Sequence, residues 1–432
     1  MKRIIVILLI AVLSFSLMSC DKKVNKLYLL NWDEYIDEGL LDKFEEEYNC
    51  KVIMEIAESN EIMYSRIDTQ SADYDIAFPS DYMISQLAKN DMLIEIDFEA
   101  LKNYDKDGFV ESLMALIERD CKDIEQYFVP YFWGSLGIMY NTDIIPDFEE
   151  RIAKLEAEGK NGWNILFDKE LESQIGMYAT SRDSIASALM ALGYSVNTKN
   201  EEELFEAEQL LKTMEYKAWA TDDLKVGVAG GKYGLALVYS GDFIDALYSI
   251  EDAKEANFKM YCPKDINNVF FDGMVIPKTS KNTELAYQFI DFMINTEASD
   301  EELAEDEEAV SNAYSNADSV GYCPTIQSVL DEFLDAVEGE IEALEEDPDA
   351  EVYYVGIVDQ DAYNPSDIDG GEVYQYLGVE TYNTYEEIYK RVKSNTDEED
   401  TNTSGYILLG LVAVIILGVG FKLVYDKKKK QY

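Results

Sequence analysis

Histidine does not occur anywhere in the 432-residue sequence. Its absence excludes the Ser-His-Asp and Cys-His arrangements that activate a nucleophile, because both use an imidazole as the base. It also excludes every zinc site that has a histidine ligand. The side chain that most often performs general acid–base catalysis is therefore missing, and we expect that the protein is not an enzyme.

Basic residues are scarce: 36 Lys and Arg stand against 87 Asp and Glu, which gives a formal charge of −51. The ten bases within residues 1–26 and 405–432 accompany only two acids, so residues 27–404 carry 26 − 85 = −59. No Lys or Arg occurs from Asn282 to Tyr389. A body with this charge repels phosphate backbones and attracts cations, so we expect no nucleic-acid partner.

Cysteine is also rare, and the few residues present are dispersed. Beyond Cys20, the sequence has Cys50, Cys121, Cys262 and Cys323, with no Cys-x-x-Cys pair. This spacing does not indicate a zinc or redox site, and we expect neither a metal nor a cofactor. Outside the cell these four cysteines are compatible with one or two disulfides and equally with buried free thiols.

The first twenty residues have the pattern of an export signal. Lys2 and Arg3 precede an apolar stretch at 4–17, which is short for a membrane span. Leu-Met-Ser-Cys at 17–20 resembles the lipobox of bacterial lipoproteins, whose cysteine is lipidated and becomes the mature N-terminus. We expect a signal peptide at 1–19 and lipidation of Cys20. An ordinary signal peptide with an incidental cysteine is the alternative.

The opposite end of the chain has the pattern of a second membrane anchor. Residues 405–421 carry no charge, and Lys422 can snorkel so that 405–425 forms a transmembrane helix of about 20 residues. A polar linker at 394–404 precedes the span, and a basic tail at 426–432 follows it. Because clustered lysines stay on the cytoplasmic side, we expect the body on the extracytoplasmic face of the cell membrane.

The body alternates between strand-like and helix-like segments. Strand patterns at 27–30, 52–56, 75–78, 175–179 and 235–239 are each followed by a helical pattern, at 39–48, 61–67, 82–87, 184–192 and 243–250. This alternation predicts an α/β protein with parallel strands and crossover helices, and the length fits two lobes. Ligands in such folds bind at the carboxyl ends of the strands.

Those strand ends bring aromatic residues and carboxylates together. The five junctions are residues 31–35, 79–82, 180–183, 239–242 and 270–273, and nearly every one contains both residue types. An aromatic face attracts an alkylammonium group, and a carboxylate accepts charge-assisted hydrogen bonds from its N–H groups. The junctions therefore predict a site for an organic cation.

Several segments in register resemble the bacterial spermidine/putrescine-binding proteins, the solute-binding components of polyamine ABC importers. They are residues 27–35, 58–64, 74–80, 130–134, 192–195, 272–277 and 321–322. The resemblance extends from Lys26 to Lys393 and thins at 296–318 and 331–371.

The resemblance implies a periplasmic-binding-protein-like fold with two lobes joined by hinge crossover strands. Lobe 1 would comprise 27–137 and 272–322, and lobe 2 would comprise 138–271 and 323–393. The lobes would close on a polyamine and deliver it to the permease subunits of an ABC transporter, and we expect a monomer.

The resemblance also implies a ligand-binding set, which is Trp32, Asp33, Tyr35, Ser80, Tyr82, Asp183, Tyr239, Phe270, Asp272 and Gln375. Asp183 and Asp272 would each hold an amine, and Tyr239 and Phe270 stand where the spermidine binder has tryptophans. A second acid of the family, three residues before Asp183, is Thr180 here. Because that acid serves the secondary amine of spermidine, its loss favours putrescine.

Two other functions stay open at this point. Asn103, Asp105 and Asp107 match the early positions of a calcium-binding EF-hand loop, but Met114 stands where a bidentate Glu belongs. A calcium-binding or other cation-binding surface lipoprotein is thus the alternative. Asp183 and Asp272 are also compatible with an acid–base pair of an enzyme, although no nucleophile or phosphate-binding glycine loop accompanies them.

The acid-rich run at 331–351 keeps apolar residues at helical spacing, which predicts one amphipathic helix. Its charged face is either simply solvated or an antenna for polycations.

Overall fold

The computed structural model describes residues 24–394, apart from 251–252, 300–302, 304–308, 348–349, 351, 359 and 361. Within this part of the chain, no helix is long and apolar enough to cross a membrane. The predicted signal peptide at 1–19, the lipidation site Cys20, the transmembrane helix at 405–425 and the basic tail at 426–432 lie outside the described residues.

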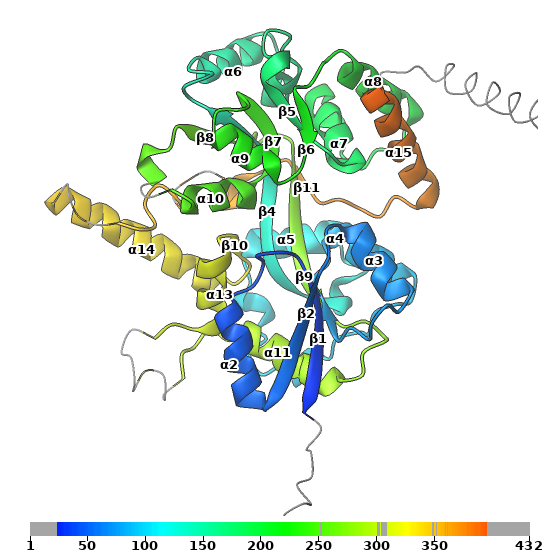
Figure 1. Cartoon of the computed structure of the whole chain (residues 1–432), viewed down its shortest axis with the longest axis vertical. Helices are drawn as coiled ribbons and strands as arrows, with labels where there is room; N and C mark the ends of the chain where they lie inside the picture. Colours follow the sequence, from blue (N-terminus) through cyan, green and yellow to red (C-terminus); the bar gives the residue numbers. More distant parts are fainter. Residues whose placement is uncertain are drawn as a thin grey trace, which may run out of the picture.

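The described chain forms two α/β lobes, one above the other in Figure 1. Hydrogen-bonded strands run in the order β2-β1-β3-β9-β4-β7-β5-β6, so β9 and β4 stand between the strands of one lobe and those of the other. The α/β periplasmic-binding-protein-like fold predicted from the sequence is therefore confirmed.

Lobe 1, the lower lobe in Figure 1, contains a parallel set of strands in which β1 pairs with both β2 and β3. Its strands are β1 (Asn25–Asn31), β2 (Cys50–Ile56) and β3 (Ile76–Ala77), and its helices are α2 (Glu38–Tyr48), α3 (Asn60–Asp68), α4 (Asp81–Lys89), α5 (Glu111–Asp120), α11 (Thr283–Met293) and α13 (Asn312–Val320).

Lobe 2, the upper lobe, repeats this design with β5 parallel to both β6 and β7. Its strands are β5 (Ile175–Tyr178), β6 (Ala218–Ala220), β7 (Leu235–Tyr239) and β8 (Phe258–Tyr261), and its helices are α6 (Phe148–Ala157), α7 (Ser181–Leu192), α8 (Glu201–Lys212), α9 (Asp223–Ala229), α10 (Ser240–Tyr248) and α15 (Val379–Ser394). The alternation predicted from the sequence agrees with these bounds to within a few residues.

Two long antiparallel strands connect the lobes: β4 (Phe128–Asn141) and β9 (Asn267–Val275). Every residue of both strands is buried. The first half of β4 pairs with β9, and the second half pairs with β7 and β8. A third, short connection is β11 (Gly371–Glu372), which pairs with the start of β9.

Short polar side chains begin the helices that face the lobe boundary. The Ser59 hydroxyl accepts a hydrogen bond from the N–H of Ile62 and starts α3, and Thr180 accepts from the N–H of Asp183 and starts α7. Helix α7 ends at Gly193, whose φ of 79° is the left-handed conformation that glycine adopts without steric cost. Such caps fix where the first turn of each helix lies.

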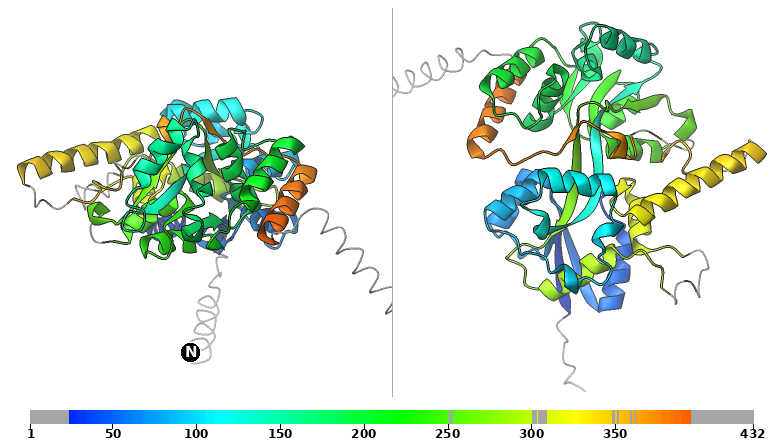
Figure 2. Two further views of the ribbon diagram at one scale, coloured as in Figure 1. Left: turned by 90° about the horizontal axis from the view of Figure 1, so that it is seen from above. Right: turned by 180° about the vertical axis from the view of Figure 1, so that it is seen from behind.

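Helix α14 (Gln327–Glu346) leaves the body at the lobe boundary and projects to one side, as the two further views show (Figure 2). The buried side chains of this helix lie in its first half and are Val329, Leu330, Phe333 and Val337, whereas Leu334 and Ile341 are exposed. The amphipathic helix predicted for the acid-rich run is thus confirmed, with a start at Gln327. Just before it, β10 (Cys323–Pro324) pairs with β4.

The four dispersed cysteines, Cys50, Cys121, Cys262 and Cys323, are buried, and within the described part of the chain no disulfide joins them. Of the two alternatives left open by the sequence, the structure therefore favours buried thiols.

Candidate ligand-binding site

The first half of the site is built around Asp272, which lies on β9. Its neighbour across a short antiparallel bridge is Ser80, the residue before α4. The carboxylate is 5% exposed, and its Oδ2 accepts a 2.6 Å hydrogen bond from the Tyr35 hydroxyl. Its Oδ1 accepts no hydrogen bond from any described residue.

Burial dominates the electrostatics of this carboxylate. It raises the pKa of Asp272 to about 6, although the Ser80 and Tyr35 hydroxyls act to lower it. A buried carboxylate with a free oxygen is costly unless a cation or a donor reaches it. Asp272 can therefore accept an ammonium group.

The second half is built around Asp183 in the first turn of α7, where the helix dipole favours a negative charge. Asp183 is 4% exposed, and its Oδ1 accepts hydrogen bonds from the hydroxyls of Tyr239 at 2.7 Å and Tyr374 at 3.0 Å. The Thr180 hydroxyl donates to Oδ2. Asp183 therefore accepts three hydroxyl hydrogen bonds, whereas Asp272 accepts one, from Tyr35, with the Ser80 hydroxyl nearby.

A wall of aromatic rings connects the two carboxylates. The ring centroid of Tyr35, which donates to Asp272, lies 5.1 Å from that of Tyr322, and the centroid of Tyr322 lies 6.3 Å from that of Phe270. The centroid of Phe270 lies 5.1 Å from that of Tyr239, which donates to Asp183. The path therefore has three ring–ring contacts and a hydroxyl–carboxylate hydrogen bond at each end, so the rings form an unbroken surface from one acid to the other.

The remaining residues of the predicted set lie at the edges of this arrangement. The Trp32 indole donates to the carbonyl of Phe78 at 2.7 Å, and the Tyr82 hydroxyl donates to Glu61 at 3.1 Å. Asp33 and Gln375 are exposed, and the backbone N–H of Gln375 donates to Asn197. Their contact with a ligand stays a prediction.

Three aromatic residues of the site were missed by reasoning from the sequence: Tyr178, Tyr322 and Tyr374. Tyr322 packs against the start of α10, where a Cβ on Gly241 would lie 1.8 Å from its ring. Tyr178 lies 5.4 Å from Tyr239. Tyr322 and Tyr374 each had a signal, because Tyr322 ends a segment of the family resemblance and Tyr374 directly precedes Gln375.

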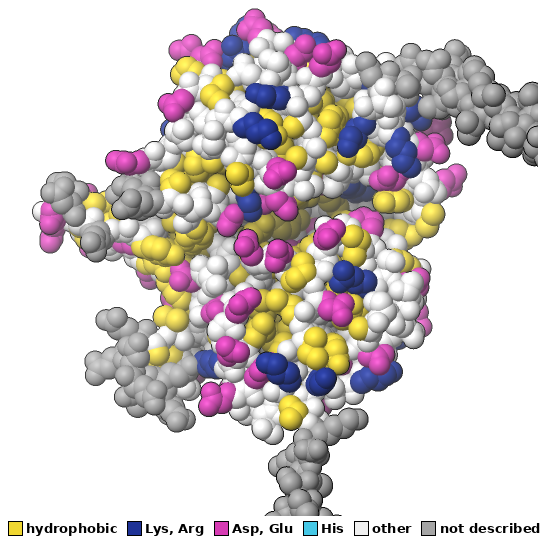
Figure 3. Space-filling model, in the orientation of Figure 1, with side chains coloured by type: hydrophobic (Ala, Val, Ile, Leu, Met, Phe, Trp, Pro, Cys, Tyr) yellow, Lys and Arg dark blue, Asp and Glu magenta, His cyan; other side chains and the backbone are white. Residues whose placement is uncertain are grey.

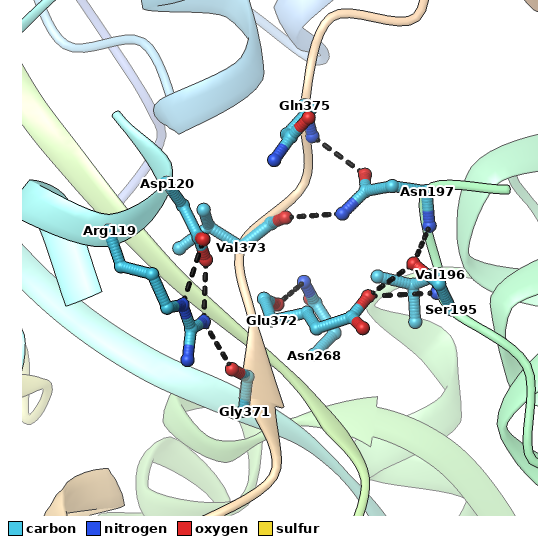
Figure 4. A network of polar contacts seen from close by, with 10 residues as sticks. All are labelled: Arg119, Asp120, Ser195, Val196, Asn197, Asn268, Gly371, Glu372, Val373 and Gln375. Carbon is cyan, nitrogen blue, oxygen red and sulfur yellow. Dashed lines mark hydrogen bonds and ion pairs between the residues drawn. The ribbon is translucent and has the colours of Figure 1, made fainter. Parts of the chain in front are cut away.

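A polar network holds the strap that carries Tyr374 (Figure 4). In this view Arg119 of α5 donates to the carbonyl of Gly371 from one side at 2.6 Å. From the other side, Glu372 accepts from the hydroxyl of Ser195, and Asn197 donates to the carbonyl of Val373 at 2.8 Å. The strap at 371–375 is thus bound to both lobes.

The residues that resemble the start of a calcium-binding EF-hand loop, 103–107, make hydrogen bonds within the protein. The Asp105 side chain accepts from the N–H of Asp107, and Asn103 binds the helix residue Asp291 through its backbone N–H and its side-chain amide. In the part of the chain that the structure describes, no group of three or more acids and cysteines could hold a metal ion.

On the face shown in Figure 3, the molecular surface is hollowed between the two lobes, and acidic side chains gather along that hollow. The sequence profile of the bacterial extracellular solute-binding proteins matches residues 39–322, which is well over half of the chain. The chain belongs to this family. Because family members bind solutes for transport, the expectation that the protein is not an enzyme agrees with the assignment.

Among curated members of the family, the putrescine-binding periplasmic protein SpuD of Pseudomonas aeruginosa is 30% identical over 287 residues, 65% of this chain and 76% of that protein. The spermidine/putrescine-binding periplasmic protein of Salmonella typhimurium is 29% identical over 280 residues, 64% of this chain and 74% of that protein. The chain is therefore similar to the polyamine-binding branch of the solute-binding proteins.

Solved structures give the same picture. The spermidine/putrescine ABC transporter substrate-binding protein of Streptococcus pneumoniae, crystallised with calcium and HEPES, has a TM-score of 0.64 and 27% identity, and covers 86% of this chain and 99% of its own. The Tp0655 (TpPotD) lipoprotein of Treponema pallidum has a TM-score of 0.65 and 25% identity, and the match covers 85% of this chain and 99% of that protein. This solute-binding protein therefore shares its fold with them along nearly all of their length.

Proposed function

We propose that this solute-binding protein captures a linear polyamine outside the cytoplasmic membrane and delivers it to the permease of an ABC importer. The observation that carries the proposal is the pair of buried carboxylates, Asp272 and Asp183, at the two ends of one aromatic wall. A diamine with an ammonium group at each end and an apolar chain between them matches that arrangement. The similarity to putrescine-binding and spermidine/putrescine-binding proteins supports it.

The two ends would hold the ligand by charge-assisted hydrogen bonds. An ammonium group donates three, and the free Oδ1 of Asp272 accepts one of them. At the other end, Asp183 accepts from the second ammonium beside its three hydroxyl donors. The methylene chain lies against Tyr322, Phe270 and Tyr239, whose ring faces also attract the ammonium charges, with a contribution of about 2 kcal/mol when desolvated.

We further propose that putrescine binds more tightly than spermidine. The described structure places the Thr180 hydroxyl on Asp183, where the family has a second acid for the secondary amine. Without that acid, the middle nitrogen of spermidine would be buried without a carboxylate. Desolvating a charge without a partner opposes binding.

The full ligand-binding set of the proposal is the predicted one, which also includes the half-buried Trp32, Ser80 and Tyr82 of lobe 1 and the exposed Asp33 and Gln375. To this set the proposal adds Tyr322 and Tyr374. The lobe division at residues 27–137 and 272–322 against 138–271 and 323–393 is retained as part of the proposal.

Two anchors would keep the binder at the membrane: a lipidated Cys20 and a transmembrane helix at 405–425. The similar Treponema protein is named a lipoprotein, which supports the first anchor. One acyl chain alone gives marginal membrane binding, and a second anchor would make it permanent.

Isothermal titration calorimetry against putrescine, cadaverine, spermidine and spermine tests the function. We expect binding of the diamines, tightest for putrescine, and weaker binding of spermidine. Tighter binding of spermidine would refute the selectivity, and no heat with any of the four would refute the polyamine proposal itself.

A further inference from the structure

Two charged groups at the lobe boundary, one buried and one half-buried, are left only partly hydrogen-bonded. The first is Asp81, the first residue of α4 in lobe 1, which is 1% exposed. Its Oδ1 accepts a hydrogen bond from the N–H of Tyr82 at 2.5 Å, but no described residue donates to its buried Oδ2. An acid so deeply buried needs a compensating charge or donor.

The second group is Arg182, which directly precedes Asp183 on α7 of lobe 2. Its guanidinium lies 4.4 Å above the ring of Tyr374, and its Nη2 donates to Asn197 Oδ1 at 2.6 Å. Its buried Nε donates to no described residue. Arg182 is therefore held in place while its buried Nε–H is unused.

The rings of Tyr82 and Tyr374 bring Asp81 and Arg182 to the same part of the lobe boundary. Tyr82 follows Asp81 in the chain, and its ring centroid lies 6.3 Å from that of Tyr374, on which Arg182 stacks. This is a contact between the two lobes. Burial raises the pKa of Asp81 and the nearby charge of Asp272 adds to this effect, whereas the backbone N–H groups of Tyr82 and Phe271 and the charge of Arg182 act to lower it.

We propose that Asp81 and Arg182 are positioning residues that pair across the lobe boundary when the lobes close. The pair would supply the missing donor to Asp81 Oδ2 and the missing acceptor to Arg182 Nε. It would stabilise the closed form in addition to the ligand, which bridges Asp272 and Asp183 nearby. The inference rests on the proposed binding function for its effect on affinity, but its effect on closure needs no ligand.

The position of Arg182 also links the pair to the site. Asn197 accepts from Arg182 and donates to the strap at Val373, and the next strap residue, Tyr374, donates to Asp183. Pairing with Asp81 would therefore draw lobe 1 toward the group that holds the Tyr374 hydroxyl on Asp183. Closure and the geometry of the ligand carboxylate are then coupled.

A double-mutant cycle tests the pair in the whole protein, with Asp81→Asn, Arg182→Met and the double variant. Small-angle X-ray scattering of the ligand-free and putrescine-saturated proteins measures closure, and calorimetry measures affinity. We expect each single variant to be more open without ligand and to bind putrescine on the order of tenfold more weakly. The double variant should be no worse than either single one, and Arg182→Lys should restore part of the loss.

Lys169→Met is the matched control, because Lys169 pairs with Glu172 at 2.5 Å inside lobe 2 and should leave closure unchanged. Strictly additive losses in the cycle, or unchanged scattering in both single variants, would overturn the pair. A wild-type protein that binds no polyamine would refute the proposed function, whereas the scattering comparison would still decide the inference about closure.

Discussion

The two ends of the site carry the same functional group but differ in how many donors already serve it. Asp272 accepts one hydroxyl and has an oxygen without a partner among the described residues, whereas Asp183 accepts three hydroxyls at the start of a helix. The donors at Asp183 satisfy its charge within the protein. At Asp272 the ligand has to provide the compensation, so we infer that Asp272 is the stronger anchor for an ammonium group.

Replacement of the stronger anchor should have the largest effect. Asp272→Asn removes the negative charge that faces the ligand ammonium, and we expect putrescine to bind at least about 100-fold more weakly by calorimetry. Asp318→Asn serves as the control, because Asp318 accepts from Tyr354 away from the site. An unchanged dissociation constant in Asp272→Asn would contradict the assigned site.

The same substitution at the other end sharpens the comparison. Asp183→Asn should weaken putrescine binding by only about tenfold, because part of the charge of Asp183 is already offset by Tyr239, Tyr374 and Thr180. The measurement is again calorimetry at one pH and salt concentration. Equal losses in Asp183→Asn and Asp272→Asn would show that the hydroxyl donors do not make the two ends different.

Acid should weaken binding through Asp272. Its pKa is raised to about 6 by burial, so lowering the pH from 7.5 to 5 leaves roughly one molecule in ten with the ionised carboxylate that an ammonium group requires. We expect putrescine affinity to fall about tenfold over this range, with most of the change below pH 6. The Asp272→Asn variant should lose most of that dependence, and a wild-type affinity that is constant from pH 7.5 to 5 would speak against Asp272 as the titrating anchor.

The sequence predicted the architecture well because its signals are local. Alternating strand and helix patterns depend on residues that are neighbours in the chain, and the bounds of α2, β7 and most other elements follow them. The long hinge strand β4 gave no such pattern. It is buried along its whole length, so it has no alternation of polar and apolar residues, and it contains Pro130.

The candidate site was predicted only in its carboxylates and some of its rings. Those residues were predicted from the resemblance to the polyamine binders and from the ends of the predicted strands. Both signals are contained in short segments of the sequence. The donors that distinguish the two ends come from distant parts of the chain, since Tyr374 and Asp183 are 191 residues apart in sequence. Contacts over such separations exist only after the hinge and the strap have placed the lobes.

The smallest predicted effect concerns stability, and it has opposite signs at the two ends. Burial raises the pKa of Asp272 in the folded protein from its ordinary value of 3.8 to about 6. The ligand-free folded state is therefore destabilised as the pH rises between these two values, by about 3 kcal/mol above pH 6. Asp272→Asn removes that charge and should raise the ligand-free melting temperature at pH 7.5 by roughly 5 °C, with a smaller gain at pH 4.

Asp183→Asn should instead lower the ligand-free melting temperature, because an amide nitrogen then meets hydroxyl groups that donate to a carboxylate in the wild type. Differential scanning calorimetry of both variants without ligand makes the measurement. A lower melting temperature in Asp272→Asn would show that the free oxygen of Asp272 does not destabilise the unliganded protein, and a higher one in Asp183→Asn would show that its hydroxyl donors do not stabilise Asp183.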